Sequence, residues 1–180
     1  DDTAALDTWG LMASWRPSGL LNGSPAQNDP PQPNFPLVVI NEVLTHSGPP
    51  PPTDTVELLN LSGTVANIGG WFLTDEFSDP KKYVITSGTT INPNSFITFN
   101  ENQFNVGPNG FSFSSLGEEV YLFSGDGTNL TGYAHGFDFG AAPTFASFGR
   151  HVNSVGSEQF PLQRSMTLGA ANAGPLIGPV

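Results

Sequence analysis

Short runs of β-branched and aromatic residues recur along the chain, and turn-forming residues separate them. Glycine (21 residues) and proline (17 residues) interrupt every window long enough for an amphipathic helix. The Asp-Gly step at 126–127 is typical of a tight β-hairpin turn. The pattern predicts an all-β, antiparallel two-sheet sandwich with less than about a tenth helix. The expected strands are 37–44, 55–61, 71–74, 83–86, 95–100, 111–114, 119–123, 130–134 and 145–148.

Large apolar residues within these runs are the expected core of the sandwich. Trp71 follows two glycines and precedes an apolar strand, so we expect it to anchor the core rather than to bind sugar. The predicted core residues are Leu58, Trp71, Ile97, Val120, Leu122 and Phe148.

The two ends of the chain do not follow the strand pattern. Residues 29–36 predict a stiff, proline-rich linker. We expect 37–174 to form the sandwich and 175–180 to be a linker to a following domain. Residues 1–28 are interpreted as the closing strand of an upstream β-domain, or as an arm that caps a sandwich edge. "SPAQNDPP" and "LGAANAGP" echo each other about 144 residues apart, which indicates tandem modules.

Residues 1–28 also carry an apolar cluster of Trp9, Met12 and Trp15. Large apolar side chains of this kind need a partner surface. We therefore predict that these three residues are interaction residues, which pack on a neighbouring domain or protein partner, or mediate self-association through an exposed sheet edge.

Several spaced motifs resemble the lamin tail domain family in its bacterial, extracellular form. They are "VVINEV", "DTVELLNLSGTVANIGGWFLTD", "YVITSGTTINPNSFITF", "SLGEEVYLFSGDG" and "ASFGRHVN", and the resemblance spans 37–174. The chain departs from the pattern at Thr55, where an aromatic is common, at Asn94, where a hairpin glycine is common, and in its closing "LGAAN". The resemblance implies an immunoglobulin-like sandwich without catalytic activity.

Composition narrows the possible partners. Sixteen acidic and five basic residues give a net charge of −11, which repels phosphate backbones and argues against nucleic acid. Lys81 and Lys82 are the only lysines, so a polybasic membrane patch is absent, and no apolar run approaches the roughly 20 residues of a membrane helix. Cysteine is absent, which excludes disulfides and thiolate metal ligands. Strong acidity and few lysines are typical of extracellular bacterial proteins.

Two glutamates, Glu42 and Glu57, interrupt neighbouring apolar runs, and three interpretations are open. As a carboxylate pair they could perform glycosidase chemistry. Together with Asp54 and with Asp75 or Asp79 they could bind Ca²⁺ through hard oxygen ligands. The favoured interpretation is structural: acids at strand ends that are solvated, or bonded to backbone amides and to Arg150 or Arg164.

Other candidate chemistry is weaker. His46, His135 and His151 are far apart in sequence and form no zinc motif, so we interpret them as loop histidines. Arg150 is expected to pair with a carboxylate across the sheet. There is no nucleophile elbow and no phosphate loop. The sequence therefore predicts no enzyme.

We expect a non-catalytic spacer or adhesion module of a large extracellular or cell-surface bacterial protein. A Ca²⁺-dependent carbohydrate- or surface-binding module is the alternative, and an accessory domain that positions a neighbouring enzyme is another. Exposed aromatic residues beside an acidic loop would favour the binding module.

Overall fold

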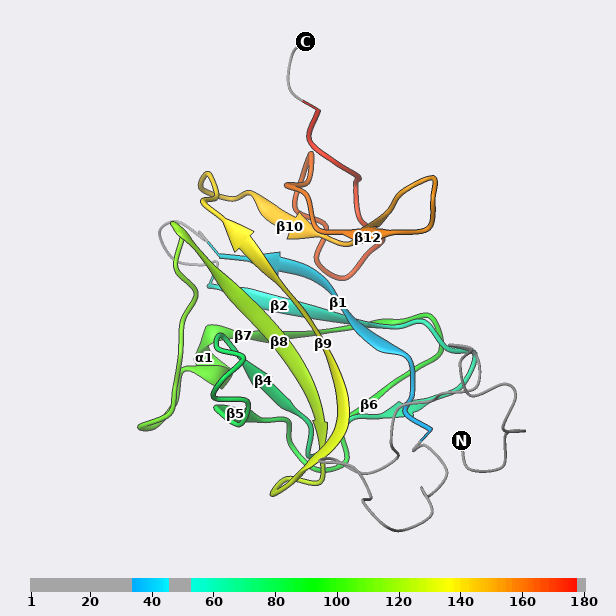
Figure 1. The fold of residues 1–180 in the computed structure, drawn as a ribbon, viewed down its shortest axis with the longest axis vertical. Coiled ribbons are helices and arrows are strands. Elements are labelled where there is room, and N and C mark those ends of the chain that lie inside the picture. Colours follow the sequence, from blue (N-terminus) through cyan, green and yellow to red (C-terminus); the bar gives the residue numbers. More distant parts are fainter. Residues whose placement is uncertain (1–33, 46–52, 178–180) are drawn as a thin grey trace, which may run out of the picture.

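The computed structural model describes residues 34–45 and 53–177. Two four-stranded antiparallel sheets face each other (Figure 1), the first with strand order β10-β1-β2-β7 and the second with order β5-β4-β8-β9. The predicted antiparallel sandwich is confirmed. The elements are β1 (Val38–Leu44), β2 (Thr55–Asn60), β3 (Ala66–Asn67), β4 (Phe72–Thr74), β5 (Tyr83–Val84), β6 (Thr90–Ile91), β7 (Phe96–Asn100), α1 (Glu101–Phe104), β8 (Gly117–Gly125), β9 (Leu130–Gly140), β10 (Ser147–Gly149), β11 (His151–Val152) and β12 (Glu158–Gln159).

A β-bulge interrupts the pairing of β1 with β2. Ile40 pairs with Leu58 and Glu42 pairs with Glu57, so Asn41 has no partner on β2. The extra residue reverses the alternation of side chains. Ile40 and Val43 therefore both enter the core, and Glu42 points away from it. A strict two-residue alternation along 37–44 would put Glu42 on the same face as Ile40, and the bulge breaks that alternation.

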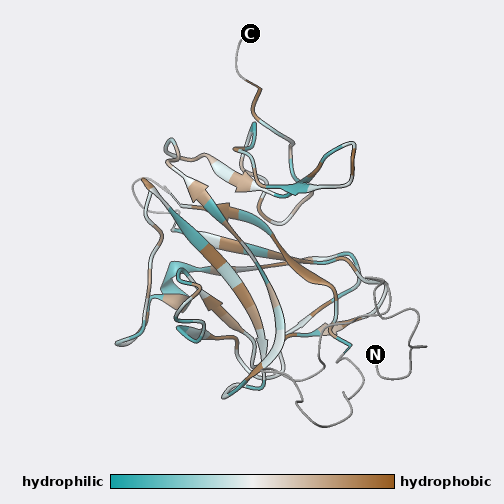
Figure 2. Ribbon diagram, in the orientation of Figure 1, coloured by the Kyte–Doolittle hydropathy of each residue, from teal (hydrophilic) through white to brown (hydrophobic). Residues whose placement is uncertain are grey.

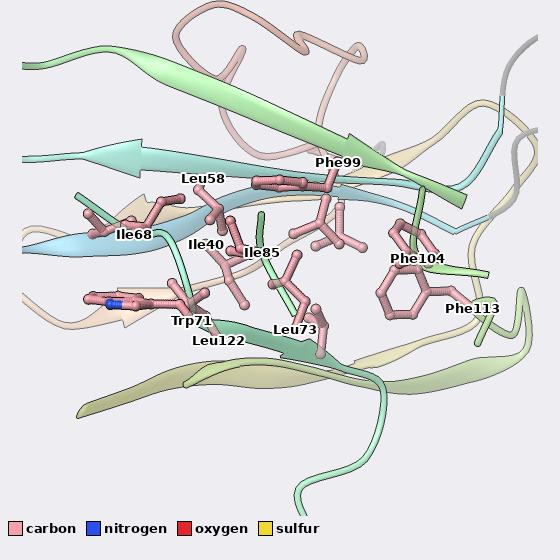
Figure 3. Packing of buried hydrophobic residues seen from close by; sticks show 14 of the residues in the cluster. Ile40, Leu58, Ile68, Trp71, Leu73, Ile85, Phe99, Phe104, Phe113 and Leu122 are labelled. Carbon is pink, nitrogen blue, oxygen red and sulfur yellow. The ribbon is translucent and has the colours of Figure 1, made fainter. Parts of the chain in front are cut away.

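Hydrophobic residues, brown in Figure 2, recur along the strands of both sheets. Apolar side chains from both sheets meet between the layers (Figure 3). Trp71, Leu58, Val120, Leu122 and Phe148 are buried there, as the sequence predicted. Ile97 is only partly buried against the cluster. Its strand, β7, is an edge strand of the first sheet, which explains its greater exposure.

The segment predicted as strand 111–114 is not a strand. A single turn of helix, α1, precedes it, with Asn100 as N-cap and Gln103 completing a capping box. Phe111 stacks on Phe104 with ring centroids 4.6 Å apart, and the backbone N–H of Phe113 donates to the Asp54 carboxylate. Aromatic packing and this side-chain bond thus replace pairing with a neighbouring strand.

Strand β9 extends well beyond the predicted 130–134. Its outward positions are mostly glycine or alanine, so the sequence lacks the alternation of apolar and polar residues that marks a strand. Eight positions of β9 nevertheless pair with β8, from Gly117 with Gly140 to Gly125 with Leu130. The hairpin turn expected at 126–127 joins these two strands.

The C-terminal segment extends the first sheet beyond β10. Leu162 bridges to Phe148, and Pro175 bridges to Gln163. The Gln163 side chain is buried and donates to the backbone oxygens of Gly149 and Pro161. The segment predicted as a linker from residue 175 therefore begins with residues that still pair with the sandwich.

Several predictions lie outside the described residues. These are the arm 1–28 with Trp9, Met12 and Trp15, most of the linker 29–36, and His46. Within the described residues, no helix has the length and apolarity needed to cross a membrane.

Candidate functional site

Glu42 and Glu57 lie directly opposite each other on β1 and β2, as neighbouring strands would require. We call these two residues the acid pair. Both are 0% exposed. They do not face the apolar core but the outer side of the first sheet, where residues C-terminal to β12 cover them. Two buried carboxylates need several donors to offset their desolvation.

The donors come from a loop that we call the closing loop, residues 164–172. Thr167 donates its backbone N–H to Glu42 Oε1 at 2.8 Å and its hydroxyl to Glu42 Oε2 at 2.6 Å. The backbone N–H of Gly169 donates to Glu57 Oε2. Ser147 of β10 donates its hydroxyl to Glu42 Oε1. Glu42 therefore binds main-chain and side-chain donors that lie more than 100 residues away in sequence, and Glu57 binds a main-chain donor at a similar separation.

Asn41, the bulge residue, ties this network together. Its amide nitrogen donates to Glu57 Oε1 at 2.8 Å and to Asn172 Oδ1 at 3.0 Å. Asn172 in turn donates to the backbone oxygens of Asn41 and Arg150. The "INE" motif of β1 and the closing "TLGAAN" motif are thus two halves of one hydrogen-bonded cluster.

Burial raises the pKa of Glu57 above its ordinary value of 4.5. The N–H of Gly169 and the amide of Asn41 oppose this rise, and the charge of Glu42 adds to it. A carboxyl group that is closed off in this way is a structural group. It can act on a substrate only if the closing loop opens.

The structural interpretation, in which the acids are solvated or bonded to backbone amides and to Arg150 or Arg164, holds in part for Glu42 and Glu57. The closing loop excludes water from both. Arg150 instead pairs with Glu158, and Arg164 donates to the backbone oxygen of Pro175. Bonding to backbone amides, the other part of that interpretation, is confirmed by Thr167 and Gly169.

The other predicted Ca²⁺ ligands lie in different surroundings. Asp54 accepts from the N–H of Phe113, and Asp75 forms an ion pair with Lys82 at 2.7 Å. No three His, Asp or Glu side chains within the described residues are placed to hold a metal ion. The set Glu42, Asp54, Glu57 and Asp75 therefore does not form one centre there, and calcium binding stays a prediction.

The described surface includes two concavities of more than 500 Å³. One, of about 650 Å³, is lined by Asn94, Ser95, Phe96, Ile97, Thr98 and Gly169. The other, of about 510 Å³, is lined by Asn34, Phe35, Pro36, Leu37, Ser62, Thr64, Val65 and Asn67. Neither lining contains an acid, a base or a histidine, so neither offers a general acid–base pair.

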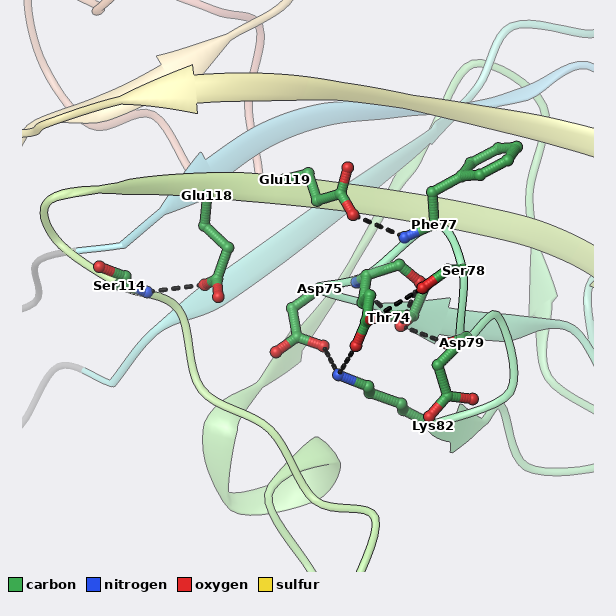
Figure 4. Close-up of polar contacts among 10 residues, drawn as sticks. Thr74, Asp75, Phe77, Ser78, Asp79, Lys82, Ser114, Glu118 and Glu119 are labelled. Atoms are coloured by element: carbon green, nitrogen blue, oxygen red, sulfur yellow. Dashed lines mark hydrogen bonds and ion pairs between the residues drawn. The ribbon is translucent and has the colours of Figure 1, made fainter.

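The loop 75–82 packs on the outward side of the second sheet (Figure 4). Thr74 donates its hydroxyl to the backbone oxygens of Glu76 and Asp79. Lys82 forms ion pairs with Asp75 at 2.7 Å and with Glu76 at 3.2 Å. These contacts fix a loop that displays Phe77 to solvent, 57% exposed. Phe77 is not among the residues predicted from the sequence, because a single aromatic in a turn carries no periodic signal.

A second polar cluster joins β9 to β12. The Nδ1 atom of His135 accepts from the N–H of Ile40 at 3.1 Å, so the Nε2 atom carries the proton and donates to Glu158 at 3.0 Å. Burial lowers the pKa of His135, although Glu158 partly opposes the shift. The predicted pairing of Arg150 with a carboxylate is confirmed, with Glu158 as its partner.

Comparison with known proteins agrees with this geometry. The family model for the lamin tail domain matches residues 31–136, more than half of the chain. No curated protein and no solved structure matches the chain. The resemblance read from the motifs is confirmed, and membership indicates a non-catalytic structural or interaction module. The chain belongs to the lamin tail domain family.

Proposed function

We propose that the chain is a non-catalytic spacer or adhesion module of a large extracellular or cell-surface bacterial protein. The observation that carries the proposal is the closure of the acid pair. Glu42 and Glu57 are the residues best suited to catalysis by sequence, yet both are fully buried and bonded to the closing loop. The side chains that could do chemistry are used to hold the closing loop against the first sheet.

The charge of the chain supports the extracellular part of the proposal. A net charge of −11 keeps a protein soluble and limits contact between copies. A module repeated along a long surface protein benefits from both properties. The absence of cysteine also removes any dependence on disulfide formation after export.

Localisation tests this proposal. An antiserum raised against the purified chain should label intact cells or the culture medium of the source. Protease added to intact cells should remove the cell-bound signal. Labelling that appears only after lysis would contradict an extracellular role.

A second candidate, a surface-binding module, is favoured by one observation. Phe77 is exposed in a loop that also carries the acidic residues Asp75, Glu76 and Asp79, which is the combination expected of a binding surface. Calcium dependence of such binding is the finer part of this candidate. Binding that is lost with a chelator and restored by Ca²⁺ would favour it over a passive spacer.

A further inference from the structure

The outward side of the second sheet carries an aromatic and acidic surface, which we call the outer face. Residues of β8 alternate, so that Val120 and Leu122 enter the core while Glu119, Tyr121 and Phe123 point outward. The neighbouring outward positions of β9 are small except for one acid. They are Ala134, Gly136, Asp138 and Gly140.

The rings of Phe77 and Tyr121 form a fixed ridge on the outer face, which we call the aromatic ridge. Phe77 meets Tyr121 edge to face with ring centroids 5.1 Å apart, and it lies 5.5 Å from the ring of Phe123. Glu119 accepts the backbone N–H of Phe77 at 2.7 Å (Figure 4). Tyr121 lies against Gly136, where a Cβ atom would meet its ring at 2.1 Å. The ridge is therefore exposed but held in place before any partner arrives.

Two acidic residues occupy directly opposite positions on β8 and β9. Glu119 pairs directly with Asp138, and Asp138 accepts the Tyr121 hydroxyl at 3.2 Å. Like charges directly opposite on a sheet destabilise it. Within the described residues, neither carboxylate forms an ion pair with a lysine, arginine or histidine. The charges of Asp138 and Glu119 also contribute, after burial and the Asp138 bond, to raising the pKa of Tyr121.

We propose that the outer face docks a lysine- or arginine-bearing segment of a partner protein. One cationic side chain would lie between Glu119 and Asp138, and its stem would lie along the rings of Phe77 and Tyr121. An ammonium or guanidinium group gains from a nearby aromatic face and from carboxylates at once. The proposal rests on the role of the chain as an interaction module and names the chemistry of its partner.

The negative charge of the chain makes a second copy or a neutral carbohydrate a less favourable occupant of the outer face than a basic segment. A second copy of the chain also carries −11 and would bring a negative surface to a negative surface. A neutral carbohydrate could stack on Phe77, but it would leave the repulsion between Glu119 and Asp138 in place. A basic segment would both relieve that repulsion and cover the rings of Phe77 and Tyr121.

The test uses the full chain, labelled with ¹⁵N, at low salt. The probe is an acetylated and amidated decapeptide of alternating lysine and glycine. The matched probe has glutamine in place of lysine, and a neutral glucan oligosaccharide is the third ligand. The lysine peptide should shift the amide signals of Phe77, Tyr121 and Gly136, while the other two should not.

Variants of the outer face, compared with matched control variants elsewhere, distinguish binding at this face from general attraction to an acidic protein. Phe77→Ala should weaken binding of the lysine peptide roughly tenfold. Glu119→Gln keeps an acceptor for the Phe77 N–H and should weaken binding roughly three- to fivefold. Glu101→Gln also removes one charge, and Phe145→Ala also removes a half-exposed ring, 50% exposed. Both controls lie outside the outer face and should stay within about twofold.

Several results would overturn the proposal. One is that the control variants weaken binding of the lysine peptide as much as the outer-face variants do, which would mean that the peptide is attracted diffusely to the acidic protein. Others are signal shifts away from the outer face, no binding at low salt, or equal binding of the glutamine peptide or the oligosaccharide. None of these changes the localisation test of the proposed function, because that test reports where the protein is rather than what it binds.

Discussion

Ile40 donates its backbone N–H to the Nδ1 atom of His135 across a distance of 3.1 Å. This bond joins the first sheet to the second next to the β-bulge of β1. The bulge interrupts the ladder to β2, and His135 bonds to the N–H at its edge. Protonation of Nδ1 would remove this acceptor and place two donors face to face.

The first prediction concerns acid pH. Burial holds the folded-state pKa of His135 below 6.5, so the unfolded chain takes up a proton there first. The stability contributed by neutral His135 is therefore complete above pH 6.5 and is lost as pH falls through the lower, folded-state pKa. A single proton limits the slope to about 1.4 kcal/mol per pH unit. Urea unfolding at a series of pH values measures it.

His135→Asn provides the comparison for this prediction. Asparagine can still accept from Ile40, but it cannot take up the proton. The variant should lose the part of the slope below pH 6.5 that depends on His135. The charged groups around the ring are Glu158 on β12 and Arg150 beside it, and both stay in place in the variant. Identical slopes in the two proteins would show that His135 is not coupled to folding.

The second prediction concerns the acid pair and has the opposite sign. The folded-state pKa of Glu57 is raised above 4.5, mainly by burial, so its ionised form costs stability in the folded protein. Its contribution is complete below pH 4.5 and is lost as pH rises through the folded-state pKa. The stability of the parent minus that of Glu57→Gln should therefore increase as pH falls from 7 towards 4.5. A constant difference over this range would refute the raised pKa.

The third prediction concerns the closing loop. Thr167→Val keeps the shape of the side chain but removes the hydroxyl that donates to Glu42 Oε2. Because a buried carboxylate oxygen loses a donor, the free energy of unfolding should fall by about 1–3 kcal/mol. Thr167→Ser retains the hydroxyl and should cost less. Thr98→Val, at an exposed position of β7, should change stability by less than about 0.5 kcal/mol.

Thermal or urea unfolding of these three variants measures the predicted differences in stability. A Thr167→Val protein as stable as Thr98→Val would mean that the closing loop adds nothing to the acid pair.

The fourth prediction concerns the core. Trp71 is 5% exposed and lies 5.6 Å from the ring of Tyr133. Trp71→Ala should cost about 3–5 kcal/mol, because it leaves a cavity that neighbouring side chains can only partly fill. Phe145→Ala removes a ring that is 50% exposed and should cost far less. Similar melting temperatures for the two variants would place Trp71 outside the stabilising core.

Most of the fold could be predicted from local sequence. Short apolar runs and turn residues specify an antiparallel sandwich, and the spaced motifs specify its family. Even the departure at Asn94 fits, because its φ of 52° is the left-handed conformation that a hairpin glycine would adopt. Asparagine tolerates this conformation better than most residues.

The acid pair could be predicted only in part. Neighbouring strands brought Glu42 near Glu57, as the sequence suggested. Their burial depends on Thr167, which lies 125 positions from Glu42, and no local pattern reports such a contact. The bulge at Asn41 was missed for a similar reason, because the bonds of its side chain go to Glu57 and to Asn172 in the closing loop.

The central claim is that the acid pair is a closed structural cluster rather than a reactive site. Native-state hydrogen exchange of the Thr167 and Gly169 amides tests it most directly, because these N–H groups donate to Glu42 and Glu57. The account predicts that both amides exchange only through global unfolding, with the same free energy as the core amides of Leu58 and Leu122. Exchange as fast as that of the exposed turn at Gly156 would show that the closing loop opens and that the carboxylates are accessible.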